Sequence, residues 1–349
     1  MKIGFLTTFG QTCPFADYAQ NLTQALIKLG HEVYILSPMG KELPGTIPSW
    51  LQFTAPMNSD AVDRMVNFLK EKEINTLLVQ PEAIGENPLL EKLIDQVNTF
   101  ARTVAILHST NYSPAINYRV FTRCLMPHPS FQPNPPGART TGILPFGVVE
   151  YTTMEQLAVP IDRYDWRVKQ HLPGKDSLLL FVFAGKTDLP ALVRTVGIIN
   201  SNGGTKPIQL LIHSWDMNNQ QVIALANEHD FVHASLGYMD QERLLLHLDA
   251  CDAVFTQYTA ISKPFTSSVL KLAIAAETVI LTNKGPHTLD VAEFLPELDD
   301  AVDISGTIRR IVNILSKYET SRRRQKINSS RAKGQLSWTK VAQTLVDTF

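Results

Sequence analysis

The sequence is poor in cysteine and has no long apolar run. Its 349 residues include three cysteines, Cys13, Cys124 and Cys251, which stand singly and without the spacing of metal ligands. This usage argues against a disulfide framework and suits a reducing compartment. No apolar run reaches the roughly 18 residues of a membrane span, and Lys2 to Leu6 predicts a strand rather than a secretory signal. We therefore expect a cytoplasmic protein.

The chain also lacks an excess of either charge. Its 32 Lys and Arg residues against 33 Asp and Glu residues give a net charge of -1, so electrostatics does not favour nucleic acid as the main partner. Hydrophobic residues make up 44% of the sequence and charged residues 19%, which suffices for packed cores. Four histidines of the second half show no ligand spacing with one another, and we expect neither a metal nor another cofactor. Those histidines are His213, His229, His233 and His247.

Strands and helices alternate through the first half. Lys2–Thr7 has a buried-strand pattern, Ala16–Leu29 has helical spacing and ends at Gly30, and His31–Ser37 is the next strand. This βαβ unit should have a right-handed crossover. The first half therefore predicts a Rossmann-like domain. The alternation continues over Asp60–Glu71 (helix), Thr76–Val79 (strand), Pro88–Phe100 (helix) and Thr103–Leu107 (strand).

The second half repeats this alternation. Leu178–Ala184 is a strongly apolar strand that opens a second domain. Thr256–Thr282 reads as a loop, a helix over Ser267–Ala276 and a buried strand over Thr278–Leu281. At about 150 residues per domain, the length also predicts two domains in an α/β protein. The expected parts are a first Rossmann-like domain (1–150), a linker (151–177), a second Rossmann-like domain (178–335) and a C-terminal helix that packs back on the first domain (336–349).

The stretch Lys263–Leu281, KPFTSSVLKLAIAAETVIL, resembles the donor-site segment of retaining family-4 (group 1) glycosyltransferases. In that family a Glu-Gly-Phe-Gly turn leads into a helix that carries a second glutamate. Phe265 and Leu270 fall on matching places of this pattern. The two glutamates of the E-x7-E motif fall on Lys263 and Lys271, so the spacing is kept and both charges are reversed. The resemblance implies the GT-B fold, in which two Rossmann-like domains face each other across a cleft.

Four further segments resemble the same family, so the likeness covers nearly the whole chain. KIxFLT followed by LxxxGHEV, at the start of the chain, is similar to the N-terminal signature of GT-B glycosyltransferases. Gly142–Gly147 is similar to the strand that closes the first domain. Phe231–Cys251 is similar to a Leu-Gly-Tyr turn followed by a helix, and Ser337–Leu345 is similar to the SWxxVAxxL terminal helix.

The resemblance implies which residues would bind the donor's diphosphate. Family members hold a glycine pair after the first strand, where Gly10 is the single glycine left; a plain turn is the alternative. Lys186 stands where the family has an arginine and would neutralise the leaving diphosphate, and a solvated loop lysine is the alternative. The family's second cation is absent here. Lys263 would attract a phosphate. The start of the following helix would offer N–H groups from Phe265, Thr266 and Ser267.

The same resemblance implies contacts to the sugar, the base and the ribose. His108 ends a strand in Leu107-His108-Ser109 and would contact the donor sugar; bonding to nearby backbone is the alternative. Lys271 replaces the glutamate that accepts from ribose hydroxyls, and its ammonium can donate to a hydroxyl but cannot accept. Backbone groups of the Leu-Gly-Tyr turn would recognise the nucleotide base. These are Leu236, Gly237, Tyr238 and Met239.

Two functions remain open at this point. The first is a glycosyltransferase that moves a sugar from a nucleotide-sugar donor to an unidentified sugar, lipid-linked or protein acceptor, with retention and without a carboxylate pair. The second is a non-catalytic GT-B partner or scaffold, which the lost glutamates favour. The basic run Ser321–Lys326 predicts a solvated helix face or weak attraction to a membrane surface, and a homo-oligomer stays open.

Overall fold

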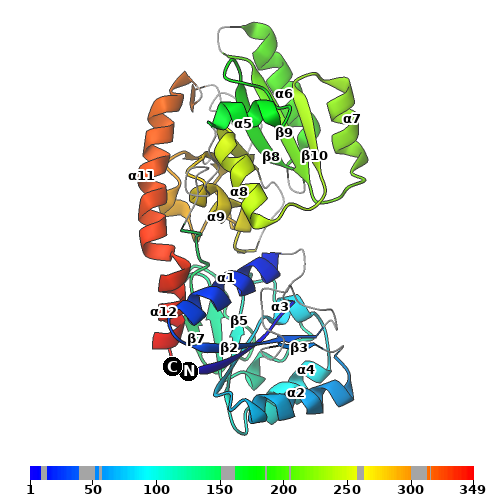
Figure 1. Ribbon diagram of the computed structural model, residues 1–349, viewed down its shortest axis with the longest axis vertical. Coiled ribbons are helices and arrows are strands. Elements are labelled where there is room, and N and C mark those ends of the chain that lie inside the picture. The colour runs from blue at the N-terminus through cyan, green and yellow to red at the C-terminus, as the bar shows by residue number, and fades with distance from the viewer. Residues whose placement is uncertain are drawn as a thin grey trace. The chain divides into compact units, whose positions relative to one another are not determined.

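A computed structural model describes residues 1–8, 14–38, 52–54, 57–150, 162–184, 187–203, 206–257, 263–299, 313–314 and 316–349. The chain divides into two compact units, which are drawn in Figure 1. Unit 1 comprises Met1–Gly147, Lys263–Thr266 and Leu336–Phe349. Unit 2 comprises Val148–Ser262 and Ser267–Gln335. Each unit is built on its own parallel sheet, as the α/β prediction requires.

The described strands of unit 1 form a seven-stranded parallel sheet in the order β3-β2-β1-β4-β5-β6-β7. The strand order reverses between β1 and β4, which is the switch point at which open α/β sheets place their ligands. The strands are β1 (Lys2–Leu6), β2 (Glu32–Ser37), β3 (Gln52–Thr54), β4 (Thr76–Val79), β5 (Arg102–Ile106), β6 (Arg123–Met126) and β7 (Thr141–Ile143). The helices are α1 (Pro14–Lys28), α2 (Ser59–Glu71), α3 (Pro81–Ile84), α4 (Leu89–Val97), the 3-10 helix η2 (Tyr118–Val120) and α12 (Trp338–Asp347).

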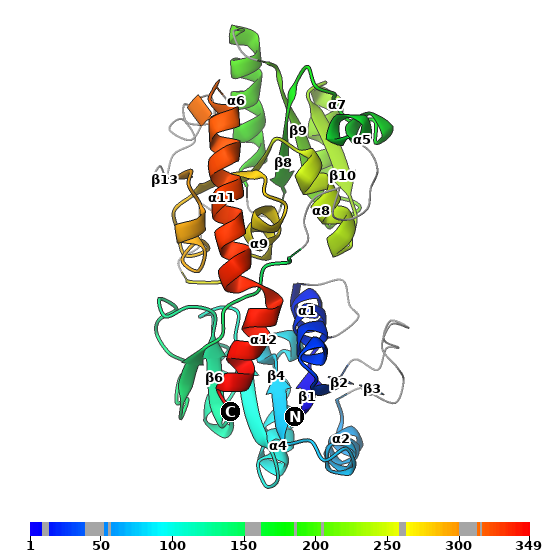
Figure 2. The ribbon, with the colours of Figure 1, turned by 60° about the vertical axis from the view of Figure 1, so that its left-hand side comes forward.

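Helices cover both faces of this sheet. Asn58 caps the start of the α2 helix, because its side chain accepts from the Ala61 N–H at 2.9 Å. The helix buries one apolar face that includes Met65 and Leu69. Together with α4 it packs against sheet side chains such as Leu77. On the other side, the C-terminal helix α12 contacts α1, as Figure 2 shows. This contact confirms the expected return of the C-terminal helix to the first Rossmann-like sheet.

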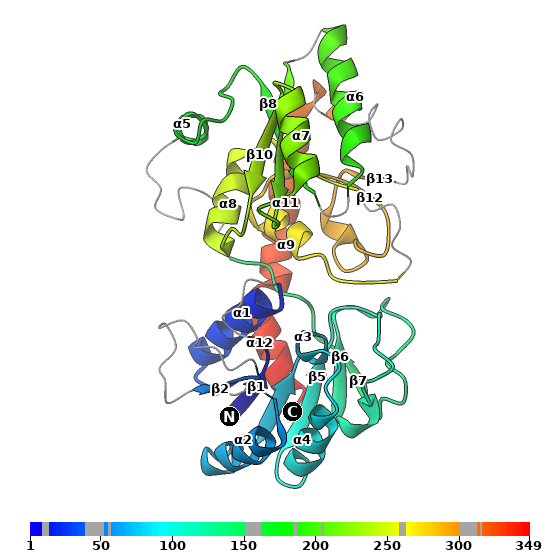
Figure 3. The same cartoon turned by 90° about the vertical axis from the view of Figure 1, so that its right-hand side faces the viewer.

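Unit 2 repeats the architecture with a six-stranded parallel sheet in the order β10-β9-β8-β11-β12-β13. All six residues of β8 are buried, which explains their uninterrupted apolar sequence. Figure 3 shows this sheet with helices α6, α7, α8 and α9 around it. The strands are β8 (Leu178–Phe183), β9 (Ile208–Ser214), β10 (Val232–Leu236), β11 (Ala253–Thr256), β12 (Val279–Asn283) and β13 (Leu298–Asp299). The helices are α5 (Arg163–Lys169), α6 (Leu189–Asn202), α7 (Gln220–Glu228), α8 (Gln241–Ala250), α9 (Ser268–Ala275), the 3-10 helix η3 (Ala292–Phe294) and α11 (Tyr318–Leu336).

Several elements differ from the sequence-based expectation. The segment 151–177, which we expected to be a linker, contains helix α5. The basic run Ser321–Lys326 lies within the long helix α11, whose buried positions are small or polar: Ser321, Gln325, Ser329 and Ala332. Such a face gives little apolar periodicity, so the sequence did not predict the extent of this helix. The helix expected at Ile308–Tyr318 lies largely outside the described residues.

Candidate functional site

The carboxyl ends of three neighbouring strands bring polar side chains together in unit 1. Thr7 follows β1, Gln80 follows β4 and His108 lies just after β5, and all three are buried. The Thr7 hydroxyl donates to the Gln80 side-chain oxygen. The Gln80 side-chain nitrogen lies 2.9 Å from His108 Nε2. Because the amide NH2 can only donate, His108 Nε2 accepts, and the ring proton of the neutral imidazole is then on Nδ1.

The His108 ring packs against aromatic side chains of α1 and of the segment that follows β7. Its centroid lies 4.6 Å from Tyr18, 5.2 Å from Phe15 and 5.9 Å from Phe146. Trp338 of α12 completes the cluster at 4.9 Å from Tyr18. Burial lowers the pKa of His108 to about 3, so the imidazole is neutral at physiological pH. The predicted contact between His108 and a donor sugar stays a prediction, and the observed partner of its Nε2 is Gln80.

Glu82 on α3 is a residue that the sequence did not single out. Its carboxylate accepts from the backbone N–H of His108 at 2.8 Å, the backbone N–H of Ser109 at 3.1 Å and the Ser109 hydroxyl at 2.9 Å. Burial raises the pKa of Glu82 to about 7, although these three hydrogen bonds oppose the shift. A carboxylate that fixes the backbone beside His108 has no sequence signature, because its partners lie 26 and 27 residues away.

The segment Lys263–Thr266 belongs to unit 1 and pairs with the residues after β5. Ser109 and Phe265 form an antiparallel bridge. The Thr266 N–H donates to the His108 carbonyl at 2.8 Å, and the Thr110 N–H donates to the Pro264 carbonyl at 2.9 Å. Unit 1 therefore brings together four of the predicted site residues: His108, Lys263, Phe265 and Thr266.

Lys271 on α9 is buried in unit 2 and pairs with a carboxylate. Its ammonium nitrogen lies 3.1 Å from Asp290 Oδ2, with the two side chains 3% and 2% exposed. Burial lowers the pKa of Lys271, and the Asp290 carboxylate opposes this shift. The predicted contact between Lys271 and a ribose stays a prediction. Ser267 caps the same helix by accepting from the Leu270 N–H at 3.4 Å.

The predicted base-recognition turn follows β10. Gly237 has a φ of +92°, which favours glycine, and a Cβ there would overlap the sulfur of Met217. Tyr238 is 39% exposed, and its ring lies 5.7 Å from that of Trp215, which is 40% exposed. Met217 is 63% exposed, whereas Met239 is buried. Exposed aromatic rings thus gather at the carboxyl ends of β9 and β10, and the sequence did not predict the contribution of Trp215.

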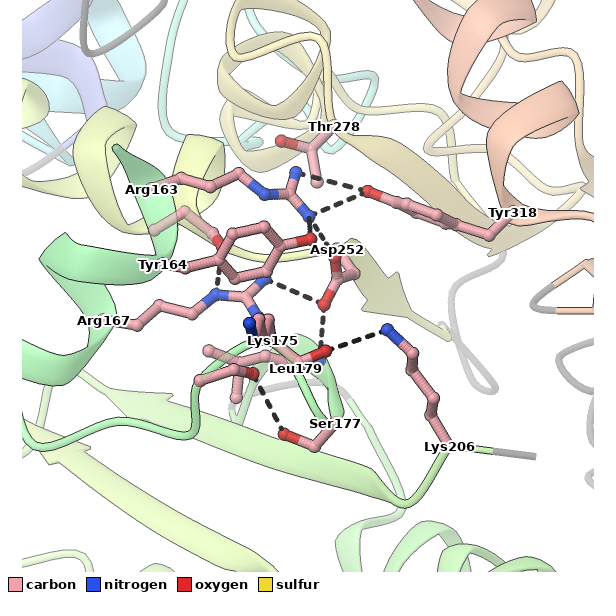
Figure 4. A network of polar contacts seen from close by, with 12 residues as sticks. Arg163, Tyr164, Arg167, Lys175, Ser177, Leu179, Lys206, Asp252, Thr278 and Tyr318 are labelled. Carbon is pink, nitrogen blue, oxygen red and sulfur yellow. Dashed lines mark hydrogen bonds and ion pairs between the residues drawn. The ribbon is translucent and has the colours of Figure 1, made fainter. Parts of the chain in front are cut away.

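A second polar cluster anchors α5 to the sheet of unit 2, as Figure 4 shows. Asp252 binds Arg167 at 2.8 Å through one oxygen and Arg163 through the other. The oxygen that binds Arg167 also accepts from the Leu179 N–H at 2.8 Å. The ring of Tyr164 lies 4.8 Å and 5.0 Å from the two guanidinium carbons. Asp252 and Leu179 are at the amino ends of β11 and β8, away from the edge at which parallel sheets bind ligands, so the cluster is structural.

Two predicted site residues, Gly10 and Lys186, lie outside the described residues. Among the residues that the structure describes, no group of three or more His, Cys, Asp or Glu side chains could hold a metal ion. The expectation of a metal-free site stays a prediction. In the same described ranges, no helix is long and apolar enough to cross a membrane. Cys124 and Cys251 are buried free thiols, and burial raises the pKa of each to about 12.

Solved structures place this architecture in a known fold. A glycosyltransferase from Rickettsia africae superposes with a TM-score of 0.69 at 11% identity, over 99% of this chain and 97% of that one. HepE from Anabaena in complex with UDP-glucose gives a TM-score of 0.67 at 12% identity, over 100% of this chain and 99% of that one. WaaG, a glycosyltransferase involved in lipopolysaccharide biosynthesis, gives a TM-score of 0.64 at 13% identity, over 100% of this chain and 99% of that one.

The chain has the GT-B fold. This confirms the fold expected from the sequence, because each neighbour is matched over nearly the whole length of both chains. No protein-family model matches the sequence, and no curated protein matches it. At 11 to 13% identity the GT-B likeness establishes the architecture and leaves the chemistry to be argued from the site.

Proposed function

We propose that this GT-B protein is a glycosyltransferase that moves a sugar from a nucleotide-sugar donor to an acceptor, with retention at the anomeric carbon. The observation that carries the proposal is the likeness, over the whole chain, to glycosyltransferases, one of them in complex with UDP-glucose. The fold alone does not fix the activity, so the residues at the strand ends must account for the chemistry.

The chain offers candidate binding groups for the base and for the diphosphate of the donor. Trp215 and Tyr238 offer exposed aromatic faces on which a nucleotide base can stack. Lys263 is exposed and offers its ammonium to a phosphate, and Lys186 would provide a second cation. Positive charge close to the departing diphosphate stabilises it in the transition state, which is an electrostatic contribution to catalysis.

His108 would orient the donor sugar as a neutral group. With Nε2 bonded to Gln80, the remaining ring N–H can donate to a sugar hydroxyl or to a backbone carbonyl. A pKa of about 3 excludes His108 as a general acid at neutral pH, because almost none of it is protonated there. The proposed chemistry therefore relies on positioning and leaving-group stabilisation.

A non-catalytic GT-B partner is the second candidate, and one observation favours it. The ammonium of Lys271, which replaces a glutamate of the resembled family, is buried and paired with Asp290. It would have to leave this ion pair to contact a ribose. A protein that kept the fold but lost donor turnover would tolerate such a replacement.

A binding screen separates the two candidates. We expect UDP, GDP or ADP, or the corresponding nucleotide sugars, to stabilise the protein by about 2.7 kcal/mol at 100 times the dissociation constant. Lys263→Glu should weaken nucleoside diphosphate binding about tenfold or more, a loss of about 1.4 kcal/mol per factor of ten. Lys326→Glu, at an exposed position of α11, is the matched control and should leave the affinity unchanged.

Turnover is measured in the same preparations as the release of the nucleoside diphosphate from the nucleotide sugar that binds. If no nucleotide binds either the wild-type protein or the Thr110→Pro variant described below, the enzymatic proposal is wrong and the scaffold candidate is favoured. Binding without any release of diphosphate, with a panel of acceptors present, would support the same conclusion.

A further inference from the structure

The segment Lys263–Thr266, here called the strap, is fastened to unit 1 mainly through its backbone. The bonds Thr266 N–H to His108 O (2.8 Å) and Thr110 N–H to Pro264 O (2.9 Å) lie on either side of the Ser109–Phe265 bridge. The chain on both sides of the strap belongs to unit 2. The strap is thus a short segment of unit 1, paired through one isolated β-bridge and inserted in the sequence of unit 2.

The side chain at the start of the strap is engaged as well. Lys263 Nζ donates to the Asn111 side-chain oxygen at 3.3 Å. The Thr110 hydroxyl adds a weak bond to the Pro264 carbonyl at 3.4 Å. The strap therefore has both of its hydrogen-bonding ends attached to the segment His108–Asn111.

Glu82 holds the surface to which the strap binds. Its carboxylate accepts from the two N–H groups of His108 and Ser109, so the carbonyl of His108 is presented to Thr266 in a fixed orientation. Tyr112, Tyr118 and neutral His108 are the titratable groups around this carboxylate, and none of them supplies a counter-charge. Glu82 is in this sense a positioning residue for the strap.

We propose that the strap is autoinhibitory: while it is docked on His108–Asn111, it withholds the Thr266 N–H and the Lys263 ammonium from the phosphates of a nucleoside diphosphate. The Thr266 N–H has a single donor direction, which docking aims at the His108 carbonyl, and one of the three donors of the Lys263 ammonium goes to Asn111, which holds that ammonium beside the strap. The Thr266 N–H cannot make a well-aligned hydrogen bond to a phosphate while it donates to the His108 carbonyl. The inference rests on the proposed function, because it names the regulation of that same donor site.

The strength of the inhibition follows from the population of the docked strap. When a ligand binds only the released form, its apparent dissociation constant is the intrinsic one divided by the released fraction. A strap that is docked in nine molecules of ten therefore weakens binding about tenfold. Any substitution that weakens docking without touching the phosphate-binding groups should tighten binding.

Thr110→Pro tests this by removing the N–H that donates to the Pro264 carbonyl. Thr110→Val is the matched control, because it keeps that N–H and loses only the hydroxyl. Asn111→Ala is a second variant at an exposed position, where it frees the Lys263 ammonium without removing buried packing. UDP and pyrophosphate are the probes, measured by isothermal titration, and hydrogen exchange at Thr266 reports docking.

We expect Thr110→Pro to speed hydrogen exchange at Thr266 and to tighten UDP binding about threefold or more. Asn111→Ala should also tighten UDP binding. Thr110→Val should have an exchange rate and a UDP affinity close to those of the wild-type protein. The proposal is overturned if Thr110→Pro and Asn111→Ala both exchange faster at Thr266 but bind UDP no more tightly than the wild-type protein. It is also overturned if the Thr266 amide is unprotected from exchange in the wild-type protein. If wild-type protein binds no nucleotide but Thr110→Pro does, the strap is inhibitory as proposed. If neither binds, both this inference and the proposed function are wrong; if wild type binds and the variants bind no more tightly, only this inference fails.

Discussion

Lys271 and Asp290 form a buried ion pair within unit 2, with 3.1 Å between the ammonium nitrogen and a carboxylate oxygen. The second oxygen of Asp290 is also buried and has no hydrogen-bond partner among the described residues. The pair thus neutralises two charges without satisfying every polar atom. Such a pair is costly to break on one side, because the remaining charge stays in a medium that solvates it poorly.

Removing one member of this pair should destabilise unit 2 strongly. We expect Lys271→Met and Asp290→Leu each to cost about 3–5 kcal/mol, and the double variant to cost much less than the sum of the two. Urea titration measures the free energy of unfolding of each variant, and hydrogen exchange in β12 reports the loss within unit 2. Lys326→Met on the exposed face of α11 is the control and should change stability by about 0.5 kcal/mol or less. Single-variant losses below about 1 kcal/mol would show that the two side chains are not paired in solution.

Asp252→Asn should loosen α5 from the sheet of unit 2. The substitution leaves the guanidinium groups of Arg163 and Arg167 buried without a counter-charge, and we expect a loss of about 3–5 kcal/mol. The loss should appear as faster proteolysis and faster exchange within Arg163–Lys169. Asp230→Asn, at an exposed turn, is the matched control and should behave as wild type. Equal exchange of α5 in the two variants would contradict an anchoring role for Asp252.

Glu82 should make the stability of unit 1 depend on pH. Its folded pKa of about 7 lies above its ordinary value of 4.5, so between these values the folded state binds a proton that the unfolded state does not. The contribution of this proton to the free energy of unfolding is fully present below about pH 4.5 and is lost as the pH rises through about 7. The total loss is at most about 3 kcal/mol.

The difference in unfolding free energy between wild type and Glu82→Gln isolates this contribution. It must be read as a difference because His108, whose folded pKa of about 3 lies below its ordinary value, acts in the opposite direction. His108 contributes stability above about pH 6.5 that is lost as the pH falls towards 3. Glu86→Gln, whose carboxylate accepts from the Ser113 hydroxyl at 2.8 Å on the surface, is the control. A flat difference between pH 4.5 and 7.5 would mean that the Glu82 carboxylate is not buried in solution.

Gly237→Ala should cost more than a comparable glycine replacement. Gly237 (φ +92°) and Gly203 (φ +66°) both have backbone conformations that an L-residue rarely adopts, but a Cβ at Gly203 would meet nothing within 4 Å. We expect Gly203→Ala to cost about 1 kcal/mol and Gly237→Ala about 2–3 kcal/mol, because only the latter displaces Met217. Thermal unfolding measures both. Nucleotide affinity should fall only in Gly237→Ala, and equal stability losses would show that Met217 adapts freely.

The sequence determined the layered α/β architecture of both units. Buried strands such as β8 read as continuous apolar runs, and amphipathic helices such as α2 read by their 3.6-residue period. The terminal helix α12 was also predictable, since Trp338 lies in a motif-like segment and buries a regular apolar face. These features are local in the chain, so their periodicity survives in the sequence.

Only the tertiary structure decided which polar groups meet. Glu82 with Ser109, Lys271 with Asp290 and Arg167 with Asp252 are pairs separated by 19 to 85 residues, and no local pattern links their members. The sequence marked Lys263 and Lys271 as the two amines in place of glutamates, but the fold assigned one to the strap of unit 1 and buried the other in unit 2. The physical reason is that apolar periodicity is set within each element, whereas the partner of a buried charge is set by which strand ends and loops the packed sheets bring together.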